Sequence, residues 1–327
     1  MRLVIKKGID QETALFLEQK YCCSFTTKAY IINKYKGKEI YTIFINDPYT
    51  EVLICVQNRT QLKICNRLSN FPKNILIAIK DELFKAFPNA EYIEIEDSYN
   101  PLSGDICSPS LTDVNIHLPT SVEDYNKILG AKSRRHYKYY LKKIQKDYSD
   151  VEIYINKVYV PEDIQLLKEL FKLKEIRSKN LHEPNLIDLN ELSTMCESYG
   201  RLSYVMVNGH CAGILVFYKV NKEYYFIQTA FNDDYKNYSL GRTILYESIL
   251  RSIEEGADNF HFLWGGAEYK NHYAGEELAL YTTAVFRKKR WTYLKFLLKV
   301  RYTNFIKGFK TSRFGKVIKP IYKRLRY

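Results

Sequence analysis

The pattern of apolar and polar residues along the chain predicts an ordered series of strands and helices. Runs that alternate between apolar and polar positions, or that are rich in β-branched and aromatic residues, predict strands. Apolar residues three to five positions apart predict amphipathic helices. Strands are predicted at 38–47, 51–68 (two strands), 90–97, 151–156, 202–208, 211–220 and 223–231. Helices are predicted at 8–21, 72–87, 131–148, 161–180 and 191–200, with a further helix start at Ser121.

One stretch, 238–270, combines a turn, a helix, a strand and a polar loop. Ser239 and Gly241 open an amphipathic helix, and residues 259–264 then alternate as a strand. The residues expected on one side of that strand are Phe260, Phe262 and Trp264. A helix that begins at a glycine-containing turn presents free backbone N–H groups and the positive end of its dipole. This stretch therefore predicts a site for a phosphate group.

The order of elements indicates two similarly built halves. A helix followed by a strand occurs at 72–97 and again at 238–264, which is a weak internal repeat. We predict an α/β (α+β) protein in which each half is a mixed, mostly antiparallel sheet flanked by helices. The segment 99–119, with three prolines, is interpreted as the connection. The predicted parts are a first half at 1–111, a second half at 112–286 and a tail at 287–327.

Composition and charge separate a globular body from a basic tail. The chain has 327 residues, of which 46% are hydrophobic, enough to form packed cores in two domains. Its net charge is +13, but residues 287–327 hold fifteen Lys or Arg and no acidic residue. The preceding 286 residues hold 35 basic and 37 acidic residues. The excess positive charge therefore lies in the tail.

Cysteine usage and hydropathy indicate a cytoplasmic protein. The seven cysteines are odd in number and form no C-x-x-C motif, which argues against a disulfide framework and a zinc site. The first residues lack the apolar core of a signal peptide, and no apolar run reaches the length of a membrane span. We expect a reducing compartment, and no metal.

Four motifs carry a resemblance to a known family. KSRRHYKYYLKKI, NGHCAGILVFY, YSLGRTILYESI and FHFLWGGAEYK follow one another between 132 and 270. In this order the chain resembles GNAT-fold acyltransferases, and in particular the CelD-like acetyltransferases associated with cell-surface polysaccharide production, which are related to Fem-type aminoacyltransferases. The likeness covers roughly 120–281 and implies two tandem GNAT-like halves. The residues that match the family pattern are Ser239, Gly241, Arg242, Gly265, Glu268, Tyr269 and Lys270. Leu240 replaces a proline of that pattern, and His261 replaces an aspartate.

The resemblance implies a donor site for acetyl-CoA or another acyl-CoA. In such enzymes the pyrophosphate binds at the turn before the helix, and the pantetheine arm pairs with the edge of the preceding strand. The residues implied for the donor are Ser239, Leu240, Gly241, Arg242 and Thr243 in the turn, with Gln228 and Ala230 on the strand. The guanidinium of Arg242 would add positive charge to the backbone N–H groups.

The resemblance also implies the groups that move protons during acyl transfer. Glu268 is the first candidate for the general base and Tyr269 for the general acid, with Lys270 beside them and His261 as the alternative base. Each has a structural alternative. Glu268 and Lys270 could form an ordinary surface pair, Tyr269 could pack on a loop, and His261 could be a buried histidine with satisfied hydrogen bonds.

We expect transfer of an acetyl or other short acyl group to a hydroxyl or amine of a cell-surface glycan or lipid-linked precursor. Two alternatives remain open. A Fem-like enzyme would take an aminoacyl group from tRNA, which the basic helix at 132–146 would attract. A degenerate transferase fold could instead serve as a membrane or RNA adaptor.

The tail at 287–327 mixes its cations with aromatic and aliphatic residues. This composition suits a segment on anionic lipid, with aromatic rings at the interface and Lys or Arg near the headgroups. RNA is the competing partner, because aromatic rings between cations also stack on single strands. We expect a cytoplasmic protein at the inner face of the membrane. We also expect a tail that is not one continuous helix, since Thr303-Asn304, Gly315 and Pro320 interrupt it.

Overall fold

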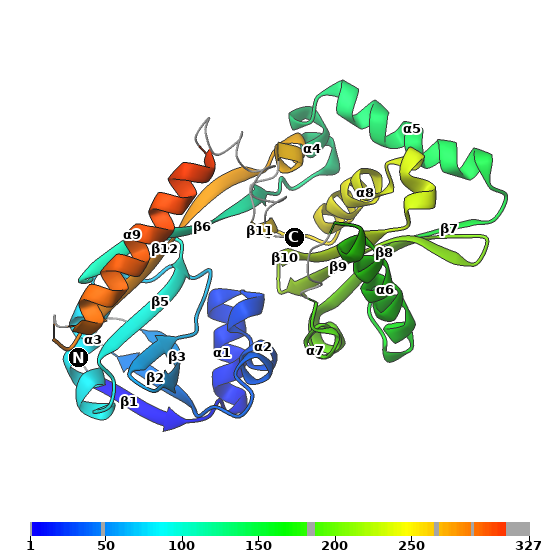
Figure 1. Ribbon diagram of the computed structural model, residues 1–327. Helices are drawn as coiled ribbons and strands as arrows, with labels where there is room; N and C mark the ends of the chain where they lie inside the picture. The colour runs from blue at the N-terminus through cyan, green and yellow to red at the C-terminus, as the bar shows by residue number, and fades with distance from the viewer. Residues whose placement is uncertain (1, 47–49, 182–186, 265–267, 289–290, 312–327) are drawn as a thin grey trace.

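The computed structural model describes residues 2–46, 50–181, 187–264, 268–288 and 291–311 (Figure 1). The first nine elements are β1 (Arg2–Lys7), α1 (Gln11–Tyr21), α2 (Lys28–Lys34), β2 (Ile40–Asn46), β3 (Glu51–Asn58), β4 (Gln61–Ile64), α3 (Ile75–Ala86), β5 (Tyr92–Ser98) and β6 (Ile106–His117). Two helices follow, α4 (Val122–Ile128) and α5 (Ala131–Asp147). The next nine are β7 (Val151–Val158), α6 (Ile164–Leu181), α7 (Leu189–Tyr199), β8 (Gly200–Val207), β9 (His210–Val220), β10 (Glu223–Phe231), α8 (Leu240–Glu254), β11 (Asn259–Trp264) and β12 (Glu276–Phe286). The helix α9 (Trp291–Thr311) comes last.

The two series of nine elements have the same order of helices and strands. Each runs strand, two helices, three strands, helix and two strands. Within the described part of the chain, twelve strands form one sheet in the order β1-β2-β3-β4-β5-β12-β6-β11-β10-β9-β8-β7. In each half the helix before the fifth strand connects a parallel pair, β4 with β5 and β10 with β11. The predicted repeat of two α/β halves is confirmed, and it extends over all nine elements.

The last strand of each half pairs with the other half. β6 is the last strand of the first half but pairs with β11 of the second. β12 is the last strand of the second half and pairs with β5 of the first. β6 and β12 also pair with each other at the centre of the sheet. Residue 112, the predicted domain boundary, lies inside β6. The two halves are therefore joined through a continuous hydrogen-bonded ladder (Figure 1).

The interpretation of 99–119 as a connection is wrong for most of its length, because β6 occupies 106–117. Its prolines suggested a loop, yet Pro109 lies opposite Tyr281 beside a shift in the β6–β12 register. A proline is tolerated at such an irregularity because fewer ladder hydrogen bonds are required there. Three further elements, β1, α2 and β12, were not predicted.

Local signals explain where several helices and turns begin. Asp10 and Thr27 accept hydrogen bonds from the first turns of α1 and α2. The predicted helix start at Ser121 is confirmed, since its Oγ accepts a hydrogen bond from Asp124 N at 3.1 Å. Asn208 and Gly209 both adopt positive φ, which is the geometry of the tight hairpin turn between β8 and β9.

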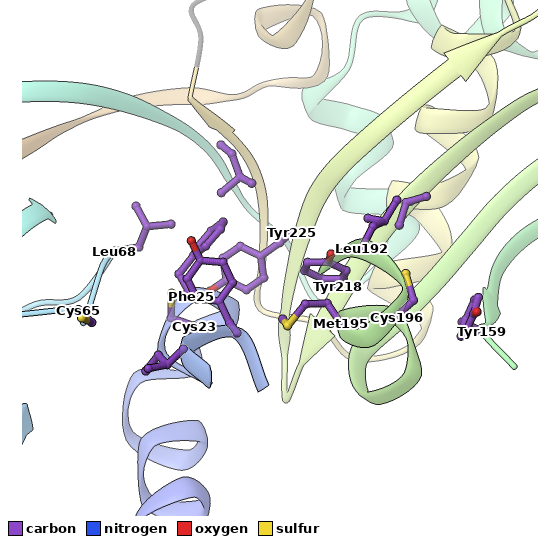
Figure 2. Packing of buried hydrophobic residues seen from close by; sticks show 14 of the residues in the cluster. Cys23, Phe25, Cys65, Leu68, Tyr159, Leu192, Met195, Cys196, Tyr218 and Tyr225 are labelled. Atoms are coloured by element: carbon purple, nitrogen blue, oxygen red, sulfur yellow. The ribbon is translucent and has the colours of Figure 1, made fainter. Parts of the chain in front are cut away.

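Helices cover both faces of the sheet. α3 packs on one face of the first half, and α4, α5 and α8 pack on one face of the second. On the other side α1, α2, α6 and α7 share one core, in which α2 contacts α7. Figure 2 shows this shared core. Phe25 lies next to Tyr225, and Tyr218 extends the core to Met195 and Cys196 of α7. The two halves are thus joined by side-chain packing as well as by strands.

The helix α9 packs against the central strands rather than extending away from the body. Phe296 lies 5.5 Å from Phe286 and 5.7 Å from Tyr92, as measured between ring centroids. Tyr293, Leu297 and Val300 complete this contact. The helix continues past Thr303-Asn304 to Thr311. None of the described helices is both long and apolar enough to cross a bilayer.

Two glycines make room for one aromatic ring at the end of β10. A Cβ at Gly213 would lie 2.4 Å from the Phe231 ring, and one at Gly241 would lie 2.7 Å from its opposite edge. Real Cβ atoms do not approach other atoms so closely, so a side chain at either position must displace Phe231. Gly241 therefore has a packing role in addition to its place at the start of α8.

We expect Gly213→Ala to lower the free energy of unfolding by about 1–3 kcal/mol, the usual cost of overpacking, in chemical denaturation. Gly130→Ala is the matched control, because a Cβ there would contact nothing within 4 Å and its φ is negative. Equal effects of the two substitutions would contradict the packing role.

Candidate active site

The turn before α8 forms one wall of a polar pocket. Ser239 adopts a left-handed conformation with φ 45°. Its side chain makes no capping hydrogen bond, so the Ser239 hydroxyl accepts from none of the first N–H groups of α8. The adjoining cavity has a volume of about 620 Å³. Its lining includes three cations, Arg177, Lys236 and Arg242, together with Ser239, Leu240 and Gly241. This combination of a helix N-terminus and positive side chains suits a phosphate-bearing ligand.

A tyrosine from the loop after β11 holds this turn in place. The Tyr273 hydroxyl donates to the Arg242 carbonyl at 2.9 Å, and its ring is fully buried and stacks on Tyr137 of α5 at 5.6 Å. Tyr137 also stacks on Tyr246 of α8 at 4.7 Å. The turn is therefore fixed by aromatic packing from two other elements.

The parallel strands β10 and β11 separate next to this turn. Their pairing covers only 223–225 and 259–261 and ends at Tyr225 and His261, although β10 continues to Phe231. The β9–β10 register shifts between Phe226 and Gln228. The edge of β10 after Tyr225 is thus not paired with β11. This is the edge that the family resemblance implies for a pantetheine arm.

A bulge changes which side chains face which side of β11. Leu263 has φ 59°, and the β6–β11 register shifts between His261 and Trp264. Phe260 and Phe262 lie in the core beneath α8, whereas Leu263 and Trp264 both join the core shared by the two halves. The expected alternation, with Trp264 on the side of Phe262, is therefore wrong at its last residue.

The strand β11 carries a histidine between two carboxylates. His261 Nδ1 donates to Asp113 Oδ2 at 2.8 Å, and its Nε2 donates to Glu223 Oε2 at 2.9 Å. Tyr99 donates to the same Asp113 oxygen at 2.9 Å, and the imidazole stacks on Tyr225 at 4.6 Å. We call Asp113, His261 and Glu223 the carboxylate–histidine triad.

Burial and charge act in opposite directions on this histidine. Burial lowers the pKa of His261, but hydrogen bonds and attraction from Asp113 and Glu223 outweigh it and raise the pKa to about 9. At neutral pH the ring carries both protons, and neither nitrogen has a free lone pair. His261 in this state is a hydrogen-bond donor that links β6, β11 and β10.

The remaining predicted catalytic residues follow β11 in a 3₁₀ turn, Glu268–Tyr273. The buried Lys270 ammonium donates to the carbonyls of Phe262, Leu263 and Trp264 at 2.9–3.3 Å, so its three N–H groups hold the separated end of β11. Tyr269 is half-buried against Phe262, and burial raises the pKa of its hydroxyl. The Glu268 side chain, like Gly265 and Gly266, lies outside the described residues.

A second, larger cavity lies on the other side of the separation, between the two halves. Its volume is about 710 Å³. We call it the inter-half cleft. The residues that line it include Lys20, Tyr21, Tyr99 and Asn100 from the first half and Glu223, Tyr225, Asn259 and His261 from the second. β6 and β12 add Asn115, Glu277 and Tyr281. Carboxylates, amides and tyrosines give this cleft many hydrogen-bonding groups, and the charges of Glu223 and Glu277 are balanced by those of Lys20 and the protonated His261.

The structure brings the predicted residues together in two groups. Ser239, Leu240, Gly241 and Arg242 lie at the cation-lined pocket, while His261 lies at the inter-half cleft. Thr243 is buried beneath the turn, and its Oγ1 has no hydrogen-bond partner within the described region. Gln228 and Ala230 lie on the part of β10 that pairs with β9 but not with β11. Sequence analysis missed Glu223 and Tyr99 at the cleft, the buried Asp113 that binds His261, and Arg177 and Lys236 at the pocket.

Comparison with known proteins agrees with this geometry. Residues 131–271 match the family described as the acetyltransferase (GNAT) domain. The protein has a GNAT fold. The crystal structure of FemX superposes with a TM-score of 0.62 at 8% identity, covering 88% of this chain and 97% of FemX. No curated protein matches the sequence.

Two further solved structures have the same fold at low identity. A protein of unknown function from Bacteroides thetaiotaomicron gives a TM-score of 0.60 at 12% identity, covering 88% of this chain and 100% of its own. L-PGS from Bacillus licheniformis gives 0.56 at 10% identity, covering 90% and 97%. At such identities the likeness extends to the fold alone. The likeness supports the GNAT architecture and does not distinguish the CelD-like branch from its relatives.

The triad predicts a specific dependence of stability on pH. Because the folded pKa of His261 is about 9 and the ordinary value is 6.5, its contribution is complete below pH 6.5 and is lost as pH rises through 9. We expect the stability difference between wild type and His261→Gln to shrink by about 3 kcal/mol over this range, in denaturation at several pH values. His210→Gln, at an exposed histidine, is the control. A constant difference between wild type and His261→Gln would contradict the charged state.

Proposed function

We propose that the protein transfers an acetyl or other short acyl group from acyl-CoA to a hydroxyl or amine of a cell-surface glycan or lipid-linked precursor, as a CelD-like GNAT enzyme. The observation that carries the proposal is the cation-lined pocket at the start of α8, next to the place where β10 and β11 separate. A GNAT acetyltransferase domain covers both features.

The donor would lie along the unpaired edge of β10. Its pyrophosphate accepts hydrogen bonds from the turn at 239–243, with charge from Arg177, Lys236 and Arg242. Its pantetheine arm pairs with backbone groups near Gln228 and Ala230. From Phe231 back to Tyr225 the strand spans roughly 20 Å, which brings the thioester to the inter-half cleft.

The acceptor would bind in the inter-half cleft. Glu223, Glu277 and the amides of Asn115 and Asn259 offer hydrogen-bond acceptors and donors for a polyhydroxylated or amino-bearing group. A lipid-linked precursor would meet the protein at an anionic membrane surface.

The proton transfers require one acceptor and one donor near the thioester. A base takes the proton of the attacking hydroxyl or amine, and an acid protonates the departing CoA thiolate. Tyr269 is assigned as the acid and Glu268, by its position in the chain, as a base. Glu223 is a described carboxylate that faces the cleft. His261 donates a hydrogen bond to Glu223 and acts as a positioning residue that orients this carboxylate.

A Fem-like transfer from aminoacyl-tRNA is the second candidate. It is favoured by the row of exposed cations on α5, which is separate from the cation-lined pocket. These cations are Arg135, Lys138, Lys142 and Lys146. They would attract an RNA backbone. The adaptor alternative rests on the two departures from the family pattern, Leu240 and His261. Leu240 is buried in the core beneath α8, and His261 is bound between Asp113 and Glu223.

Donor binding gives the first test. Acetyl-CoA should raise the melting temperature of the wild type by several degrees, because a ligand that binds only the folded state stabilises it. Arg242→Glu should abolish the shift by placing a negative charge against the pyrophosphate. Arg251→Glu, an exposed position on the same helix, is the matched control. No shift with any acyl-CoA, combined with protection by aminoacyl-tRNA, would favour the second candidate.

Proton transfer gives the second test. With acetyl-CoA and a panel of amino sugars, Tyr269→Phe and Glu223→Gln should each lower kcat by about 10²-fold or more, measured as release of free CoA. Both variants should keep the thermal shift with acetyl-CoA. Full activity in either variant would remove that residue from the proposed roles. No release of CoA by the wild type with any acceptor would support an adaptor.

A further inference from the structure

The helix α9 has a second apolar face opposite the one that packs on the sheet. Trp291, Leu294, Leu298 and Tyr302 are spaced three, four and four residues apart, which places them on one stripe of the helix. Their side chains are 42–68% exposed. The packed residues Tyr293, Phe296, Leu297 and Val300 lie on the other side. We call Trp291, Leu294, Leu298 and Tyr302 the outer stripe.

Cations border the outer stripe on both sides. At 100° per residue, Lys295 and Lys299 fall along one edge and Arg301 along the other. The Lys295 ammonium lies 5.6 Å from the Trp291 ring centroid. Residues 287–327 contain fifteen Lys or Arg and no acidic residue. An apolar stripe with positive edges is the arrangement that binds the interface of an anionic bilayer, where the apolar side chains enter the acyl boundary and the cations meet the headgroups.

We propose that the outer stripe of α9 binds the surface of an anionic lipid bilayer and holds the protein there in one orientation. The inner face of the same helix is packed against Phe286 and Tyr92, so α9 lies parallel to the bilayer and stays attached to the sheet. The orientation of the body on the membrane is therefore set by the packing of α9. This surface lies apart from the cation-lined pocket and does not depend on the proposed acyl transfer.

The composition of the stripe favours a bilayer over RNA or a second copy of the chain. Stacking on bases would use Trp291 and Tyr302, which are about 16 Å apart along the helix axis, and would leave Leu294 and Leu298 in water. A two-fold contact between copies would bring the same cations, Lys295 and Arg301, against each other. A bilayer buries all four apolar side chains and neutralises both edges.

Removal of the whole tail is a poor test, because Phe296 belongs to the folded core and its loss would expose Phe286. Point variants on the outer stripe avoid this. The full-length Leu294→Gln/Leu298→Gln variant should keep the melting temperature of the wild type. Its partition onto vesicles of phosphatidylcholine with phosphatidylglycerol should fall about tenfold or more, measured by sedimentation. Ile128→Gln, at a position 59% exposed on α4, should bind as the wild type does.

Charge and fluorescence give independent readouts. Binding should be much weaker on phosphatidylcholine alone and in high salt, and Lys295→Glu/Arg301→Glu should weaken it on anionic vesicles. Vesicles should shift the tryptophan emission of the wild type to shorter wavelength, and Trp291→Phe, which retains the half-buried Trp264, should lose that shift.

Three results would overturn the proposal. One is binding to anionic vesicles that the leucine double variant does not change. Another is a dimer in solution that this variant dissociates. The third is a full-length protein that binds single-stranded RNA through the outer stripe and not vesicles. Acetyl-CoA stabilisation, measured on the same variants, should be unchanged, so a failure here is distinguishable from a failure of the proposed transferase activity.

Discussion

The charged hydrogen bonds of the carboxylate–histidine triad hold the sheet together at the point where it divides. Asp113 comes from β6, His261 from β11 and Glu223 from β10, so the triad ties three strands together, and His261 stands in the last pair before β10 and β11 separate. The Asp113 and Glu223 carboxylates, which bind the two nitrogens of one imidazole ring, would repel each other without a cation between them. The imidazolium supplies that charge. A separation of parallel strands would otherwise leave the end of β11 unsupported, and Lys270 completes the support by binding its three carbonyls.

The pocket and the cleft owe their positions to this local arrangement. The separated strands leave the edge of β10 accessible between the cation-lined pocket at the α8 turn and the inter-half cleft. Tyr273 links the two regions, because it lies in the turn after β11 and holds the Arg242 carbonyl. The residues that position the site are thus more numerous than those that would touch a donor, and several of them are buried tyrosines.

Local signals made the α8 turn predictable, and long-range contacts made the triad unpredictable. Ser239 and Gly241 mark a helix start within a few residues, and the hairpin at Asn208 is equally local. Asp113 and Glu223 lie 148 and 38 residues from His261 in sequence, and no spacing pattern relates them. β6 was missed because its prolines and serines resemble a loop, while its pairing with β11 and β12 depends on strands that occur much later. The bulge at Leu263 was also unpredictable, because it occurs in the pairing of β11 with β6. This bulge turns the Trp264 side chain to the opposite face of the sheet from the expected one.

The exchange of β6 and β12 between the halves restricts how the protein can move. Many two-part proteins open and close by a hinge, because only a short linker and a polar interface join their parts. Here a rotation of one half against the other would have to break the pairs β5–β12, β12–β6 and β6–β11, which run through the middle of the sheet. The walls of the inter-half cleft are consequently held at a fixed separation. Entry of a ligand is left to side chains and loops at its rim, and the size of a ligand that fits the cleft is set by the architecture of the sheet itself.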